Sequence, residues 1–280
     1  MFIEPHLIVS AGVSLYEHRK TLSEAFRRLG YRLRHGRLEL VTFGAGGVGK
    51  STFGRFVANP NDRAIREAKY KDSIGMEQFG VPGPISARLI VPPGQERRRK
   101  QDWPRLFTIM EREKKAFGVI NVVAYGYHSL DQEIAEDVIA HNAAPTPRNL
   151  QSFVKKNRLS EVEALKQIVP HLKNARELAW MITLVTKQDL WWNERGTVED
   201  HYTKGSYSTL IKEVATHRGA NFKHEFLSAS IVINNFATID GKIVAPTNAG
   251  YDQVLQMAHQ EKLIETLTTF MKEGVHGVTS

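Results

Sequence analysis

A glycine-rich segment that ends in lysine and serine is the part of this sequence whose residue types and spacing most clearly indicate chemistry. Residues 44–51 read Gly-Ala-Gly-Gly-Val-Gly-Lys-Ser and fit the pattern G-x-x-x-x-G-K-[ST]. Glycines let consecutive backbone N–H groups turn inward and form a positively polarised nest for phosphate oxygens. Lys50 can then bridge the two terminal phosphates of a nucleotide, and the Ser51 hydroxyl can bind Mg²⁺. The residues predicted to hold phosphate are Gly44, Gly46, Gly47, Val48, Gly49, Lys50, Ser51 and Thr52.

Three further short segments follow strand-like runs. They are Pro93-Gly94-Gln95-Glu96, Thr186-Lys187-Gln188-Asp189 and Ser228-Ala229-Ser230. With the glycine-rich loop they resemble, in the right order, the motifs of Ras/Rab-like small GTPases within the translation-factor-related (TRAFAC) class of P-loop proteins. The resemblance covers most of residues 38–235 and implies that the protein binds GTP with Mg²⁺ and hydrolyses it to GDP and phosphate.

The resemblance implies a role in base recognition for the second and third segments. Asp189 would accept hydrogen bonds from the guanine N1–H and N2 amine, a donor pair that adenine lacks. Lys187 would lie along the base plane, and Thr186 would brace the phosphate loop. The backbone N–H of Ala229, between Ser228 and Ser230, would meet the guanine O6.

The first of the three segments would carry the hydrolysis step. Gln95 would orient the attacking water and act with Lys50 as a catalytic residue, while the N–H of Gly94 would contact the terminal phosphate. The arginines and lysine at 97–100 follow directly. A solvated face is the favoured interpretation of this run, and an arginine that reaches the phosphate is the alternative.

The metal site departs from the family pattern. Besides Ser51, the resemblance offers Ser73 as a Mg²⁺ ligand, because residues 72–77 resemble the family's T-I-G-[VM]-[DE] segment. Val91 stands where the family has the aspartate that holds Mg²⁺ through a water, and valine cannot do so. A pseudo-GTPase scaffold that binds guanine nucleotide with little or no turnover therefore stays open. The loop alone would also fit an ATPase or a small-molecule kinase.

The elements that must position these residues alternate between strand and helix. Strands are expected at 37–43, 87–91, 119–125, 180–185 and 224–227, and helices at 51–58, 103–116, 150–176, 203–217 and 250–273. This alternation predicts an α/β protein with a mainly parallel sheet and helices on both faces, the three-layer sandwich of P-loop NTPases. A hairpin is expected within 231–250, and an acidic insertion of unassigned role at 129–148.

Residues 14–36 predict a basic amphipathic helix, with leucines and Phe26 on one stripe. We expect an N-terminal helical extension over 1–36 and one GTPase domain over 37–280. Docking of the helix on its own domain is favoured, and contact with an anionic membrane surface is the alternative.

Composition limits the remaining function classes. The chain has 280 residues, a net charge of +8 and no cysteine, so disulfides, thiol catalysis and cysteine-bound metals are excluded. A cytoplasmic protein is expected, with peripheral membrane contact as the alternative. No histidine spacing predicts zinc, and no module predicts specific nucleic-acid binding. The expected partner is a protein effector or regulator that contacts switch regions at about 62–83 and 92–105.

Overall fold

The computed structural model describes residues 38–62, 64–67, 75–82, 87–111, 116–129, 147–175, 178–237, 243–245, 248 and 250–277. Its centre is a six-stranded sheet with the order β2-β3-β1-β4-β5-β6. Only β2 runs antiparallel to its neighbour, β3, and the other pairs are parallel. The strands are β1 (Leu38–Phe43), β2 (Glu77–Val81), β3 (Ala87–Val91), β4 (Ala116–Val123), β5 (Trp180–Thr186) and β6 (Lys223–Ala229).

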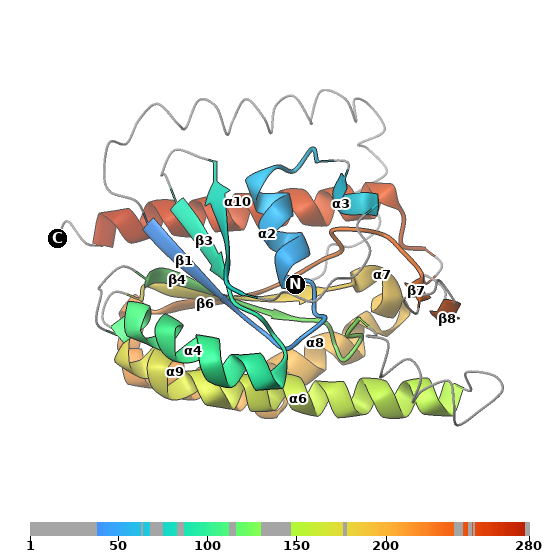
Figure 1. Ribbon diagram of the computed structural model, residues 1–280, viewed down its shortest axis with the longest axis horizontal. Helices are drawn as coiled ribbons and strands as arrows, with labels where there is room; N and C mark the ends of the chain where they lie inside the picture. Colours follow the sequence, from blue (N-terminus) through green and yellow to red (C-terminus); the bar gives the residue numbers. More distant parts are fainter. Residues whose placement is uncertain are drawn as a thin grey trace.

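Helices cover both faces of this sheet (Figure 1). On one face lie α2 (Lys50–Ala58) and α10 (Gln253–Gly277), and on the other α4 (Glu96–Glu111), α6 (Pro147–Asn174), α8 (Arg195–Thr203) and α9 (Ser206–Arg218). The central strands are apolar on both faces because successive side chains point to opposite sides. Leu40 therefore packs in the cluster with α2 and α10, and Val41 in the cluster with α4, α6 and α9. The expected three-layer α/β architecture is confirmed.

Parallel strands bring the candidate site residues to one edge of the sheet. The glycine-rich loop follows β1, Gly94 and Gln95 follow β3, and residues 186–189 and 230 follow β5 and β6. The carboxyl ends of parallel strands face the same way, so these loops meet. The short elements near this edge are α3 (Ala64–Glu67), α7 (Gln188–Trp191) and the 3₁₀ turn Trp192–Glu194, whereas the 3₁₀ turn Gly219–Asn221 leads into the opposite end of β6.

Several expected boundaries differ from the structure. The helix expected at 103–116 begins at Glu96, because Arg99 and Trp103 continue the inward stripe of Leu106 and Met110. The helix expected at 203–217 is α9, which begins at Ser206. Gly205, where a Cβ would lie only 2.7 Å from His201 O, separates it from α8, which was not expected. Strand β2 was not expected at all.

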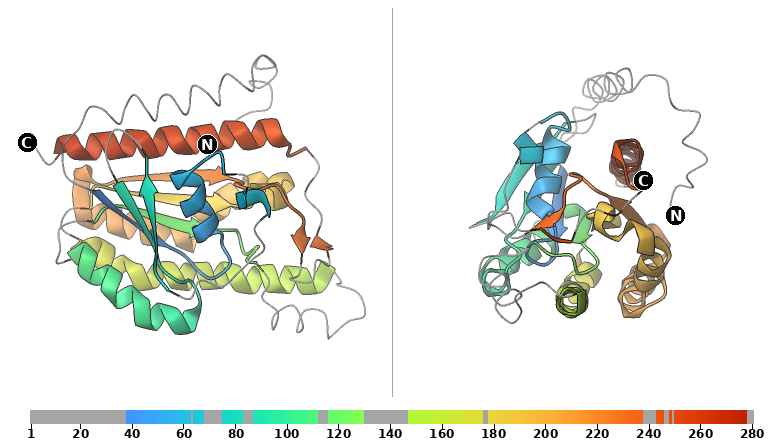
Figure 2. Two further views of the ribbon diagram at one scale, coloured as in Figure 1. Left: turned by 45° about the horizontal axis from the view of Figure 1, so that its top comes forward. Right: turned by 90° about the vertical axis from the view of Figure 1, so that its right-hand side faces the viewer.

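The hairpin expected within 231–250 is present. β7 (Phe236–Ala237) pairs antiparallel with β8 (Ile243–Ala245), and Figure 2 shows this pair beyond the end of the main sheet. The expected N-terminal helix at 14–36, Ser73 and residues 130–146 of the acidic insertion lie outside the described residues.

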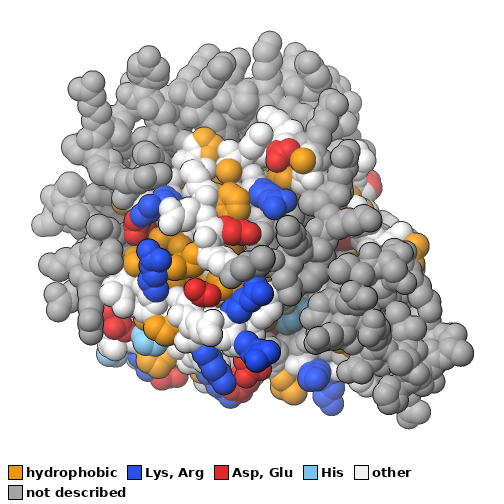
Figure 3. Space-filling view, in the orientation of Figure 1, with side chains coloured by type: hydrophobic (Ala, Val, Ile, Leu, Met, Phe, Trp, Pro, Cys, Tyr) orange, Lys and Arg blue, Asp and Glu red, His pale blue; other side chains and the backbone are white. Residues whose placement is uncertain are grey.

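Described charged side chains of both signs are visible on the face drawn in Figure 3. On that face the described Lys and Arg side chains are interspersed with Asp and Glu. Within the described ranges, no helix is both long enough and apolar enough to cross a membrane.

Candidate functional site

The glycine-rich loop adopts backbone conformations that require glycine. Gly44, Gly47 and Gly49 have φ angles of 138°, 72° and 95°, and Gly49 directly precedes the first turn of α2. L-residues with a Cβ rarely adopt such angles. The loop therefore delivers its backbone N–H groups to the N-terminus of a nine-residue helix, where the helix dipole favours an anion.

Lys50 is folded back onto this loop. Its Nζ donates to Gly44 O at 3.0 Å and to Ala45 O at 2.7 Å. Burial, and then the positive charge of Arg99, lower the pKa of Lys50 to about 7, while the carboxylate of Glu77 acts in the opposite direction. An ammonium group has three donors, so one remains for a ligand after these two contacts.

Two contacts hold the loop against the ends of β4 and β5. Thr186 Oγ1 donates to Val48 O at 2.6 Å and also lies 3.0 Å from Val123 O. On the other side, the N–H of Ser129 donates to Gly47 O at 2.9 Å. A Cβ at Gly47 would lie 2.6 Å from Ser129 N, which explains why only glycine fits there.

Asp189 is buried and held by its neighbours. Ser230 Oγ donates to Asp189 Oδ1, and the backbone N–H of Asn234 donates to Oδ2 at 3.2 Å. Burial raises the pKa of Asp189, although these hydrogen bonds act to lower it. The residue is only 1% exposed, so both oxygens face protein rather than solvent.

The serine beside Asp189 is Ser230 and not Ser228. Ser228 Oγ instead accepts a hydrogen bond from Gln188 Nε2 at 3.0 Å. Ala229 is still within β6, where it pairs with Thr186. Of the segment 228–230, only the side chain of Ser230 contacts Asp189 in the described structure. Because all three residues are small, the sequence does not show which of them makes this contact.

Residues 231–237, named here the covering segment, pack over Lys187 of the segment 186–189. The Phe236 ring is buried and lies 5.7 Å from Lys187 Nζ. It also contacts the rings of Tyr127 and Phe153, with centroids 5.9 Å and 6.2 Å away. Lys187 Nζ donates to Ser129 Oγ at 3.0 Å, and burial lowers its pKa to about 7 although nearby carboxylates act to raise it.

Gly94 and Gln95 lie directly against the phosphate loop. A Cβ at Gly94 would be 2.2 Å from Lys50 Nζ, and one at Gly46 would be 3.6 Å from Gln95 N. Gln95 Oε1 is buried without a hydrogen-bond partner in the described part of the chain. The contacts bring together Gly44, Gly46, Gly47, Val48, Lys50, Gly94, Gln95, Thr186, Lys187, Asp189 and Ser230.

The acidic groups that would hold a metal are few. Val91 is fully buried among apolar side chains, and its own side chain has no oxygen that could bind a metal. Among the described residues there is no group of three or more His, Asp or Glu side chains that could bind a metal ion. Glu77 lies opposite Val91 in the β2–β3 pairing, and its charge acts on Lys50. Ser51, in the first turn of α2, offers a hydroxyl next to Lys50.

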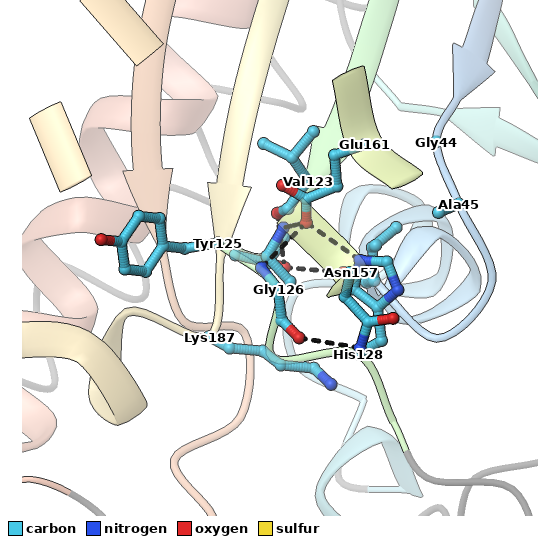
Figure 4. A network of polar contacts seen from close by, with 12 residues as sticks. Gly44, Ala45, Val123, Tyr125, Gly126, His128, Asn157, Glu161 and Lys187 are labelled. Atoms are coloured by element: carbon cyan, nitrogen blue, oxygen red, sulfur yellow. Dashed lines mark hydrogen bonds and ion pairs between the residues drawn. The ribbon is translucent and has the colours of Figure 1, made fainter. Parts of the chain in front are cut away.

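A buried carboxylate network below the site escaped sequence analysis (Figure 4). Glu161 of α6 is 1% exposed, and its Oε1 accepts from Ala124 N at 2.8 Å, Gly126 N at 3.2 Å and His128 Nε2 at 3.0 Å. Its Oε2 accepts from Tyr202 OH at 2.7 Å. A glutamate in a helix reads as a surface residue in sequence, so only the tertiary contacts reveal this role.

The pKa values of both titratable groups of the network are shifted downward. Burial acts to raise the pKa of Glu161, but the hydrogen bond and charge of His128 and the donors Ala124 and Tyr202 outweigh it and hold the pKa below its usual value. Burial lowers the pKa of His128, against the effect of Glu161. The contact of Glu161 Oε1 with His128 Nε2 and its hydrogen bonds from Ala124 and Gly126 therefore fix the chain that leads from β4 to Ser129.

Comparisons with known proteins add little to this geometry. A scan against protein-family models finds no match, and a search of curated proteins finds none either. Among solved structures, one titled "The Structure of the Mammalian SRP Receptor" matches 69% of this chain and 91% of its own, with 18% sequence identity and a TM-score of 0.43. An identity and TM-score this low decide nothing about activity.

Proposed function

We propose that this protein binds GTP and hydrolyses it to GDP and phosphate, acting as a nucleotide-dependent switch on a protein partner. The observation that carries the proposal is the 2.6 Å hydrogen bond from Thr186 Oγ1 to Val48 O. It joins a glycine-rich phosphate loop to the segment that ends in Asp189. A chance glycine turn would have no such link to a buried carboxylate.

The phosphate half of the proposal rests on the loop and α2. Backbone N–H groups of residues 46–51 and the third donor of Lys50 would bind the phosphates. Gln95, whose Oε1 lacks a partner beside Gly46, would orient the attacking water, with the N–H of Gly94 on the terminal phosphate.

The base half rests on Asp189. Each carboxylate oxygen already accepts one hydrogen bond and keeps a lone pair for the N1–H and N2 donors of guanine. Because Asp189 is 1% exposed, the base can reach it only when the covering segment moves. We propose that the N–H of Ile231, which follows Ser230, meets the guanine O6 in place of Ala229.

A magnesium ion would be held by the hydroxyl of Ser51 and by the carboxylate of Glu77, whose charge acts on Lys50, with Ser73 as a further ligand. The ion would neutralise charge on the phosphates. Val91 supplies nothing here, which supports the second candidate, a pseudo-GTPase scaffold that holds guanine nucleotide with little turnover.

Several wider assignments remain part of the proposal. Residues 37–280 would form one GTPase domain, with switch regions at about 62–83 and 92–105 that contact an effector or regulator. The basic segment 14–36 would pack on this domain or bring the protein to an anionic membrane surface from the cytoplasm. Liposome pelleting with anionic lipid, repeated after deletion of 1–36, separates these two outcomes.

The deciding experiment is calorimetric titration of nucleotide-free protein with GDP, a non-hydrolysable GTP analogue and ATP, with and without Mg²⁺. Guanine-selective binding that Asp189→Asn reduces at least tenfold is expected, since two charge-assisted hydrogen bonds weaken. Equal binding of ATP, unchanged in Asp189→Asn, would instead indicate an ATPase or kinase. Single-turnover hydrolysis that Gln95→Ala abolishes supports the GTPase over the pseudo-GTPase.

A further inference from the structure

Arg99 is a buried cation that forms no ion pair with any described residue, although the charge of nearby Glu96 acts on it. It lies in the first turns of α4, is 7% exposed, and its Nε and Nη1 have no hydrogen-bond partner in the described part of the chain. None of the ion pairs between described residues includes it. An arginine keeps its proton in proteins, so the positive charge remains although it is removed from water. Such a charge is costly unless an anion accompanies it.

The surroundings of Arg99 place it at the phosphate loop. Its backbone N–H donates to Gln95 O at 2.9 Å, and the residue before Gln95 lies against Lys50 Nζ and Ala45. The positive charge of Arg99 is one of the causes that lower the pKa of Lys50. Lys50 and Arg99 are thus two cations in one poorly solvated region. Among the described carboxylates, Glu77 is the one whose charge raises the pKa of Lys50.

The guanidinium group of Arg99 is also held in place by the ring of Trp103. Its Cζ lies 5.4 Å from the centre of the Trp103 ring, one helical turn further along α4. A cation over an aromatic face is attracted by the ring and loses side-chain freedom. The neighbouring Arg97 is exposed, so the burial of Arg99 is a property of its position and not of the basic run as a whole. The expectation of a wholly solvated face at 97–100 is therefore wrong for Arg99.

We propose that Arg99 is a phosphate-binding residue whose guanidinium donates to the terminal phosphate of a nucleoside triphosphate, beside Lys50. The inference rests on the proposed function and adds a residue to it. A nucleoside diphosphate lacks the group that Arg99 would bind. Arg99 therefore distinguishes the triphosphate from the diphosphate, and it couples the start of α4 to the presence of the terminal phosphate.

The test compares Arg99→Gln with the exposed neighbour Arg97→Gln, by titration of each with GDP and with the non-hydrolysable GTP analogue in Mg²⁺. Arg99→Gln is expected to lose roughly tenfold to a hundredfold in affinity for the analogue, the scale of a hydrogen bond to a charged group, and to keep its affinity for GDP. Arg97→Gln should change neither affinity. Arg99→Lys, which keeps the charge but not the planar fork, should lose less than Arg99→Gln.

The alternatives give different results. If the wild-type protein binds neither guanine nucleotide, the proposed function fails. If the wild type binds both and Arg99→Gln changes both equally or neither, the proposed function stands and the role of Arg99 is overturned. Removal of an unpartnered buried charge should also leave the melting temperature of the nucleotide-free protein equal or higher. A lower melting temperature would mean that Arg99 stabilises the fold instead, and would overturn the inference.

Discussion

Glu77 of β2 pairs directly with Val91 of β3, so a carboxylate lies across from the position where the resembling family has its metal-associated aspartate. If Glu77 takes over that role, Glu77→Gln removes the charge that attracts Mg²⁺ and keeps the shape of the side chain. We expect the Mg²⁺ concentration that half-saturates binding of the GTP analogue to rise about tenfold, the usual effect of losing an outer-shell ligand. Glu96→Gln, an exposed carboxylate at the start of α4, is the control. An unchanged Mg²⁺ midpoint would exclude Glu77 from the metal site.

Lys50 makes the stability of the nucleotide-free protein depend on pH. Its pKa is about 7 in the folded chain and 10.5 when unperturbed, so between these values the unfolded state binds more protons and stability rises with pH. Lys50→Met should therefore be more stable than the wild type near pH 7. That advantage should shrink by up to about 1.4 kcal/mol for each pH unit towards pH 10. Thermal melts in phosphate-free buffer measure it.

The matched control for this pH effect is Lys100→Met, because Lys100 is exposed. Its stability difference from the wild type should not vary with pH. A pH-independent difference for Lys50→Met as well would show that the Lys50 ammonium stays fully charged in the folded protein.

Phe236 is buried against Lys187, so in the proposed site it lies where a base would approach that lysine. Phe236→Ala removes two aromatic contacts worth about 1–3 kcal/mol together, which would otherwise hold the covering segment closed. We expect the association rate of a fluorescent guanine nucleotide to rise about tenfold or more in stopped-flow measurements. Phe270→Ala in α10, whose ring packs on Trp180, should lower stability without changing this rate. Equal rates in the wild type and Phe236→Ala would mean that the covering segment does not limit entry.

Glu161 should be among the most sensitive charged positions of the protein. Glu161→Gln converts one acceptor oxygen into a donor opposite the Tyr202 hydroxyl and leaves the backbone donors at 124 and 126 weakly paired. Loss of a buried charged partner is expected to cost about 3 kcal/mol in the free energy of unfolding. Glu163→Gln, two residues along α6 and with its side chain 63% exposed, should change it by less than about 0.5 kcal/mol. Similar effects for the two variants, in denaturant titrations, would contradict the network.

The sheet could be predicted from sequence because its strands are apolar on both faces and end in recognisable turns. The run at 87–91 matches β3 residue for residue, and the strand pattern expected from Arg37 to Phe43 matches β1 to within one residue. Strand β2 could not be predicted, since the sequence EQFGV has only two large apolar residues and lies on the sheet edge. The start of α4 was misplaced because Arg99 takes a core position that a hydrophobic pattern assigns to apolar residues.

The conformation of the glycine-rich loop was predictable because its glycines and lysine lie close together in the sequence, and its backbone angles follow from them. The contacts that bury Asp189 were not, since Asn234 lies 45 residues further along and donates through its backbone, which any residue type could do. The choice of Ser230 over Ser228 depends on where β6 ends, and strand ends are the least certain feature of a sequence pattern.

The Thr186 hydroxyl has a single proton and lies between two carbonyl oxygens, those of Val48 in the phosphate loop and Val123 at the end of β4. If a bound phosphate shifted the loop, the contact with Val48 would weaken and the contact with Val123 would be favoured, so Thr186 would report phosphate binding to the segment that ends in Asp189. Coupling between two sites is reciprocal. If phosphate binding at the loop strengthened base binding at Asp189, base binding would strengthen phosphate binding by the same free energy. The two halves of a nucleotide, offered as separate fragments, would then bind cooperatively.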